Sequence, residues 1–231
     1  MNSIISWFQQ LQFGGLLSTL VVVAASLLCI TVHETCHGLA AYRLGDPTAK
    51  NAGRLTLNPL RHVDLMGLVM MAIVKFGWAK PVPIDMRYFK NPKAGMALTA
   101  AAGPASNVLL ALAALLLRSV LLFFAIGNPD SALWYYLVLF TEYVAVISAG
   151  LAVFNLFPIP PLDGSKVLFS VLSDSAYYQL MRYERYGMLL LMALLLTGVL
   201  DGPLYFLRDG LLDGLQAISL WPLELLLKFS H

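Results

Sequence analysis

Charged residues are scarce in this chain. Asp, Glu, Lys and Arg make up 12% of its 231 residues, whereas 59% of the residues are hydrophobic. Soluble domains carry about 25% charged residues, so the composition excludes an ordinary soluble protein and indicates a membrane protein. The net charge of +2, without a basic stripe along the chain, gives no reason to expect nucleic acid as a partner.

Cysteine is almost absent, with only Cys29 and Cys36 in the chain. Both fall on one predicted helix, where their spacing corresponds to about 10 Å along the axis. This distance exceeds the Cα separation that a disulfide tolerates, so we expect no intramolecular disulfide. We expect Cys29 to pack against neighbouring helices. Cys36 is a minor candidate metal ligand, because it lies close to the predicted metal but the two nearby histidines define the ligand face.

Basic residues are missing from the N-terminal part, where none precedes Arg43. A cleavable secretory signal needs a basic start and a cleavage site after a short apolar core, so we expect this segment to stay in the mature protein. Nine of the fifteen Lys and Arg residues fall within 43–93. The positive-inside rule then places this connection on the cytoplasmic side, with the first helix entering from outside.

Long apolar runs occupy much of the chain. A membrane-spanning helix needs about 20 predominantly apolar residues. Such runs lie at 15–40, 95–125 and 132–157, with a shorter one at 185–200. A fifth run, 203–229, contains charges and either crosses the membrane or lies along its surface. We therefore predict an all-α polytopic membrane protein, one domain over 1–231 with about 4–6 transmembrane helices.

The basic segment 43–93 contains a stretch that does not fit a transmembrane helix. Residues 62–76 are too short and too polar at their edges to span, and Pro81 and Pro83 in the following segment 77–85 exclude a helix. We predict a re-entrant or membrane-associated β-loop here. Such backbone persists at membrane depth only where protein or a water-filled cavity covers it.

Residues 33–37 read HETCH and follow a run without charge, Gly14 to Val32. Residues four apart on a helix differ by about 40° in direction, so His33 and His37 project from one face. This HExxH pattern binds zinc and activates a water, with Glu34 beside the ligands as general base. Such groups are costly at membrane depth, which points to function. The alternative is a histidine pair satisfied by hydrogen bonds within a helical bundle.

A catalytic zinc site requires a third protein ligand. Asp163 is the strongest candidate, because prolines end the apolar run before it and Gly164 permits a turn that aims the carboxylate into the bundle. The alternative for Asp163 is a solvated carboxylate in a cytoplasmic turn. Three residues are weaker candidates for the third ligand: His62, Asp64 and Glu142.

Several ordered motifs carry a resemblance to a known family: HETCH, RLGDPTAKNAGRLTLNPLRHVD, GWAKPVPID, AGPASN and FNLFPIPPLDG. Together they resemble the site-2 protease family of intramembrane zinc metalloproteases, in its short prokaryotic branch without PDZ or CBS domains. The resemblance covers most of residues 30–200. It implies one Zn²⁺ per chain held by His33, His37 and Asp163, with Glu34 as the catalytic base.

The resemblance also implies roles for two other parts of the chain. Asn107 resembles a family asparagine near the active site, where an amide donates to a developing oxyanion or orients substrate. Alternatively, Asn107 bonds across helices as part of their packing. The segment Gly77 to Asp85 resembles the family's β-loop, whose strand edge could hold an unwound substrate by strand addition.

The predicted function is therefore hydrolysis of peptide bonds of transmembrane substrates, within or near the cytoplasmic side of a prokaryotic cell membrane. The expected partners are transmembrane proteins or peptides and the lipid bilayer, and the chain could also form an oligomer. One alternative is a non-proteolytic membrane protein that binds or transports metal, but such a site needs no base like Glu34. A catalytically dead scaffold is disfavoured because the predicted ligands and the base are all present.

Overall fold

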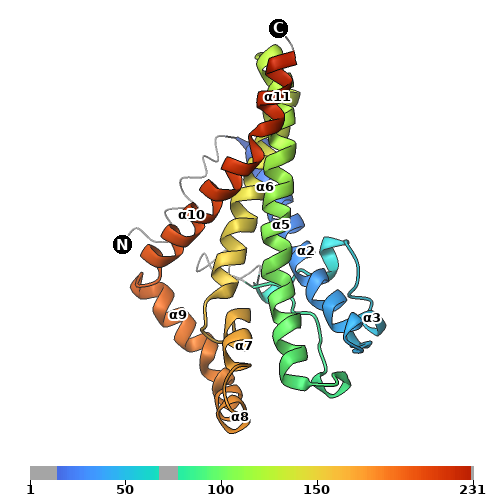
Figure 1. The fold of residues 1–231 in the computed structure, drawn as a ribbon, viewed down its shortest axis with the longest axis vertical. Coiled ribbons are helices and arrows are strands. Elements are labelled where there is room, and N and C mark those ends of the chain that lie inside the picture. The colour runs from blue at the N-terminus through green and yellow to red at the C-terminus, as the bar shows by residue number, and fades with distance from the viewer. Residues whose placement is uncertain (1–14, 68–77, 230–231) are drawn as a thin grey trace.

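The computed structural model describes residues 15–67 and 78–229, and helices dominate both ranges (Figure 1). Four helical stretches are long and apolar enough to cross a membrane: Leu16–Arg43, Pro92–Gly127, Ala132–Leu156 and Asp201–Phe229. No sheet occurs among the described residues. The prediction of an all-α protein with several transmembrane helices is thus confirmed for this part of the chain.

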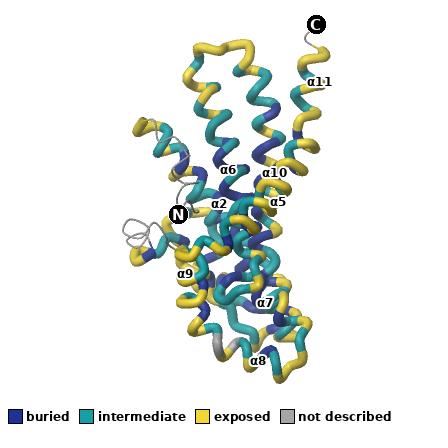
Figure 2. The backbone as a smooth tube through the Cα atoms, turned by 90° about the vertical axis from the view of Figure 1, so that its left-hand side faces the viewer, coloured by how far each residue is buried: buried dark blue, intermediate teal, exposed yellow. Residues whose placement is uncertain are grey.

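Three long helices form the core: α2 (Leu16–Arg43), α5 (Pro92–Gly127) and α6 (Ala132–Leu156). Helix α5 runs along most of the molecule with α6 beside it (Figure 1). Small side chains are buried where these helices meet, including Ala25, Ala111 and Ala149, and they let the backbones approach closely. Cys29 is buried among them, as expected. Figure 2 shows that the connection between α5 and α6 is exposed.

Local sequence signals set the ends of these helices. The side chain of Asn91 accepts a hydrogen bond from the Ala94 N–H, and Pro92 occupies the first turn of α5, where a missing N–H costs nothing. Helix α2 ends at Arg43, and Gly45 follows with φ of 108°. Because this left-handed conformation favours glycine, the chain can leave the helix there and turn back along it.

Short elements fill the connections between the long helices. The connection after α2 holds α3 (Thr48–Asn51), η1 (Pro59–Arg61) and η2 (Met86–Tyr88). After α6 come α7 (Asp163–Phe169), α8 (Asp174–Tyr183) and η3 (Glu184–Tyr186). Helix α7 packs against α5 and α6, which places the start of α7 inside the bundle.

The C-terminal region differs from the sequence expectation. The expected span 185–200 holds α9 (Gly187–Thr197), whose 11 residues extend about 16 Å, whereas the hydrocarbon core is about 30 Å thick. The run 203–229 folds as α10 (Asp201–Ser219) and α11 (Trp221–Phe229). Together they form the fourth stretch with the length and composition to cross a membrane. Helix α10 packs on α5 and α6, and α11 on α5.

The predicted β-loop lies partly outside the described residues, because its beginning falls within 68–77. The described part, 78–85, is extended and contributes an isolated antiparallel bridge between Val63 and Ala79. No paired strands form there. The periodic pattern of a strand is interrupted by two prolines, each of which removes a ladder N–H.

The backbone donors of this extended segment are directed into the protein. The Lys80 N–H donates to the His62 carbonyl, and the Val82 N–H donates to the Glu34 carboxylate. Pro81 and Pro83 have no N–H to offer. The described part of the segment therefore leaves few donors for the strand addition that the sequence suggested.

Candidate metal centre

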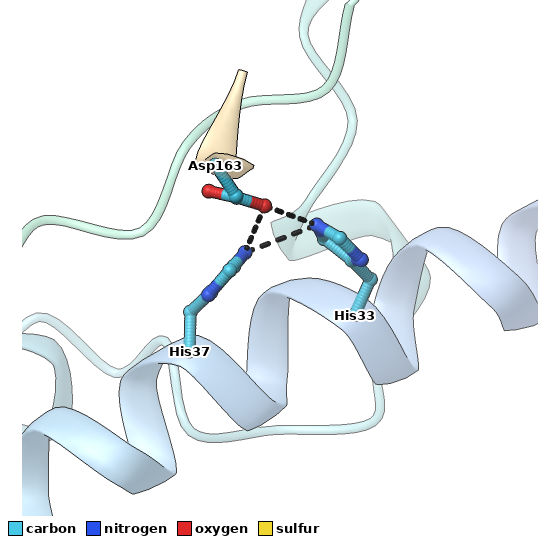
Figure 3. A group of neighbouring side chains, drawn as sticks. All are labelled: His33, His37 and Asp163. Carbon is cyan, nitrogen blue, oxygen red and sulfur yellow. Dashed lines mark hydrogen bonds and ion pairs between the residues drawn. The ribbon is translucent and has the colours of Figure 1, made fainter. Parts of the chain in front are cut away.

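Three side chains from two distant parts of the chain converge in the core (Figure 3). The Oδ2 atom of Asp163 lies 3.2 Å from His33 Nε2 and 3.1 Å from His37 Nε2. The two Nε2 atoms are 3.0 Å apart. These residues are the one group in the described part of the chain with three metal-ligating side chains close together. They are the three residues that the sequence predicts as ligands.

The two histidines and Asp163 approach from opposite sides. His33 and His37 project from the same face of α2, one turn apart, and Asp163 begins α7 (Figure 3). Gly164 allows the start of α7 to lie directly against the end of α6. A Cβ at Gly164 would overlap the Leu156 carbonyl and lie 2.6 Å from the Phe157 oxygen. Glycine is thus required here for close backbone approach, with no need for a left-handed conformation.

The imidazole of His37 is oriented by a contact behind the centre. Its Nδ1 lies 2.7 Å from the Thr99 carbonyl oxygen on α5. A carbonyl only accepts, so Nδ1 carries the proton and donates it. In the neutral ring, Nε2 then presents a lone pair toward Asp163. This arrangement, with one nitrogen bonded to the protein and the other free, is typical of histidines that bind metals.

Asn107 occupies the corresponding place behind His33. Its side chain is fully buried, and its amide nitrogen lies 3.2 Å from His33 Nδ1. The amide oxygen has no hydrogen-bond partner among the described residues. Turning the amide by 180° lets this oxygen accept a hydrogen bond from the Nδ1–H of His33, which leaves the Nε2 lone pair free to bind metal. The orphaned oxygen therefore fits a histidine whose Nε2 binds metal.

Gly103 lies on α5 between Thr99 and Asn107, and its backbone faces both histidine rings. A Cβ at Gly103 would lie 2.5 Å from His37 Cε1 and 2.7 Å from His33 Cε1. Such distances are shorter than carbon–carbon contact by about 1 Å. Only a residue without a side chain leaves room for both rings, so the backbone of α5 forms a cradle for them.

The residues of the centre fit a zinc ion. Two imidazoles and a carboxylate are a ligand set of catalytic zinc sites, in which a fourth position stays open. Bonds of about 2.05 Å at tetrahedral angles place ligand atoms about 3.3 Å apart, close to the observed separations. Asp163 supplies the carboxylate of this set, and its Oδ2 faces both Nε2 atoms.

The predicted base Glu34 and the weaker ligand candidates are not members of this three-residue group. Glu34 follows His33 on α2, and its Oε2 accepts a hydrogen bond from Val82 N–H. The weaker ligand candidates have other partners or positions. His62 bonds to the Thr56 carbonyl, Asp64 accepts from the Gly67 N–H, Glu142 pairs with Arg118, and Cys36 does not join the metal-ligating group.

Two contributors were not identified from the sequence as part of the site: Thr99 and Gly103. With Asn107 they are spaced four residues apart, so all three lie on one face of α5. This spacing was the available signal. Thr99 contributes its carbonyl, however, which any residue type possesses, and the role of Gly103 consists of the side chain it lacks.

Comparison with known proteins finds similar sequences that are named zinc metalloproteases. Residues 123–198, which include Asp163, match the sequence profile of Peptidase family M50. The chain is 35% identical to "Putative zinc metalloprotease YwhC" of Bacillus subtilis, over 76% of this chain and 80% of that protein. It is 31% identical to "Putative zinc metalloprotease Rip2" of Mycolicibacterium smegmatis, over 79% of this chain and 69% of that protein.

A protein of the same name from Mycobacterium tuberculosis is also 31% identical, over 84% of this chain and 73% of that protein. No solved structure matches the chain. The family profile leaves residues 33–37 outside its match, but the relatives align with more than three quarters of the chain. The chain belongs to Peptidase family M50, the site-2 protease family, and is a multi-pass membrane zinc metallopeptidase.

Proposed function

We propose that this metallopeptidase hydrolyses peptide bonds of transmembrane substrates within or near the cytoplasmic side of the membrane. The observation that carries the proposal is the position of the predicted ligands. His33 and His37 are buried on α2, which has the length and composition of a membrane-spanning helix, and Asp163 reaches them from α7. A soluble substrate would have to reach a centre enclosed by apolar helices.

His33, His37 and Asp163 would hold the zinc ion. When bound, zinc supplies a Lewis acid that polarises the scissile carbonyl and makes water more acidic. Glu34 takes the proton from the attacking water at its carboxylate and delivers it to the leaving amine. Asn107, fully buried behind His33, orients that imidazole, so we assign it to the metal site in place of the oxyanion.

The depth of the centre follows from its distance to the first basic residue. His33 precedes Arg43 by about 15 Å along α2. Lys and Arg residues concentrate in 43–93, and this distribution supports a cytoplasmic location for that end of α2. Cleavage is therefore expected below the membrane surface on that side, at a point where the substrate helix has unwound.

The function is tested with purified full-length protein in liposomes that also contain a single-span transmembrane peptide. Wild type is compared with Glu34→Gln, which keeps the shape of the side chain but not its basicity. Glu224→Gln is the matched control, because Glu224 is an exposed carboxylate on α11. Mass spectrometry identifies the cleaved bond, and elemental analysis measures zinc in each preparation.

We expect wild type and Glu224→Gln to cleave within the apolar part of the peptide, and Glu34→Gln to retain zinc without cleaving. Equal cleavage by wild type and Glu34→Gln would remove Glu34 as the base. Cleavage restricted to soluble peptides would contradict the transmembrane substrate class while leaving the metallopeptidase intact.

A further inference from the structure

The carboxylate of Glu34 is anchored by a backbone group far away in the sequence. Its Oε2 accepts a hydrogen bond of 3.0 Å from the Val82 N–H. Because Val82 stands between Pro81 and Pro83, this N–H is the only backbone donor of the tripeptide. The sole donor is therefore directed at the predicted catalytic base.

The extended segment is held in turn by Arg54, from the connection after α2. Its guanidinium donates to two successive carbonyls, with Nη1 3.1 Å from the Pro81 oxygen and Nη2 2.6 Å from the Lys80 oxygen. Arg54 is only 6% exposed, and among the described residues no carboxylate pairs with it. Burying a guanidinium without a carboxylate partner costs free energy. If Arg54 served only to pack against the extended segment, an apolar side chain at this position would stabilise the fold more.

Close packing brings this segment within reach of α2. Gly38 lies one turn after Glu34, and a Cβ there would lie 3.1 Å from Val82 Cγ1 and 2.7 Å from Leu55 Cδ2. The bare backbone at Gly38 lets Val82 sit against the helix, where its side chain is buried. Val82 is thus fixed on two sides, by packing on Gly38 and by the Arg54 contacts to the preceding carbonyls.

We propose that Arg54 is a positioning residue for Glu34, which acts through the carbonyls of Lys80 and Pro81 and the N–H of Val82. Anchoring Oε2 leaves the other carboxylate oxygen free to handle the proton. A general base must lie within hydrogen-bond reach of that proton, and a misplacement of about 1 Å costs about 100-fold in rate. The measurements of kcat described next rest on the proposed function, because they require a substrate that the protein cleaves.

Val82→Pro removes the N–H and keeps the extended path, because a residue before proline already favours the β or polyproline region. Val82→Ala sets the baseline, since it shortens the same side chain but keeps the N–H. We expect kcat of Val82→Pro to fall about 10- to 100-fold below that of Val82→Ala, with equal KM and zinc content. Equal kcat in the two variants, or a difference confined to KM, overturns the proposal.

A double-mutant cycle tests whether Arg54 acts through Val82. Arg54→Gln alone is expected to lower kcat, and in the Val82→Pro background it should lower kcat by less than about twofold further. If the two losses multiply, Arg54 acts by another route and the positioning role is refuted.

A measurement without turnover separates this inference from the proposed function. With ¹⁵N-valine labelling of the zinc-loaded full chain, amide hydrogen exchange at Val82 is compared in wild type, Glu34→Ala and Arg54→Gln. We expect exchange at least about tenfold faster in both variants, because each loses a bond that holds this amide. Unchanged exchange in both contradicts the proposal even if the enzyme is active. Accelerated exchange supports it even if no substrate is cleaved and the proposed function fails.

Discussion

Gly103→Ala should abolish tight zinc binding while the helical bundle stays folded. The added methyl would lie 2.5 Å from His37 Cε1 and 2.7 Å from His33 Cε1. Relief requires one or both rings to move by about 1 Å, since carbon atoms pack at about 3.5 Å or more. Zinc–ligand distances vary by only about 0.2 Å, so a shift of this size breaks the ligand geometry.

Loss of an outer contact to a metal site lowers affinity by about 10- to 100-fold, and direct displacement of two ligands should exceed that range. Helix propensity acts in the opposite direction, because alanine stabilises a helix interior by about 1 kcal/mol relative to glycine. A loss of zinc therefore cannot be attributed to weakening of α5. Zinc affinity is measured by competition with a chromophoric chelator, and folding by size exclusion and circular dichroism.

Gly150→Ala is the matched control. Gly150 lies on α6, and a Cβ there meets no atom within 4 Å. This variant should keep wild-type zinc affinity and gain slightly in thermal stability. If Gly103→Ala binds zinc as tightly as Gly150→Ala does, the cradle at Gly103 is not part of the metal centre.

Three further predictions concern the residues around the centre. Asp163→Ala should bind zinc far more weakly in the same competition assay, and unchanged zinc content would remove Asp163 as a ligand. Asn107→Ala should lower zinc affinity by about 10- to 100-fold. Asn107→Asp should retain more of that affinity, because an ionised carboxylate only accepts hydrogen bonds and can still accept from His33. Weaker zinc binding by Asn107→Asp than by Asn107→Ala would argue against an amide oxygen facing His33. Gly164→Ala should displace the start of α7 and reduce both zinc affinity and melting temperature. The competition assay measures the first and thermal unfolding the second. Normal zinc affinity in this variant would contradict the close approach of Gly164 to Leu156.

The sequence was most informative where function depends on residue type at a fixed local spacing. His33 and His37 share a helix face because of helical periodicity, and that relation survives in any fold that keeps the helix. The expectation for Asp163 came from local turn chemistry, and the structure indeed brings its carboxylate to the histidines.

Other features could not be predicted, because they depend on long-range packing or on backbone atoms. The contact between Thr99 and His37 uses a carbonyl, and that between Val82 and Glu34 uses an N–H, so neither is encoded by a side-chain pattern. The C-terminal region differs from expectation because of helix length. The run 185–200 is strongly apolar, but its helix α9 has only 11 residues, whereas α10 and α11 together are long enough to cross a membrane despite their charges.

The different origins of the three predicted ligands have a mechanical consequence. His33 and His37 belong to one rigid helix, but Asp163 stands at the start of a seven-residue helix that follows a proline-rich turn. An ion bound by all three would staple that turn to α2, closing a loop of more than a hundred residues that includes all of α5 and α6. Zinc would then cross-link the helical bundle in addition to taking part in catalysis. The zinc affinity would therefore report how well the proline-rich turn packs against the bundle.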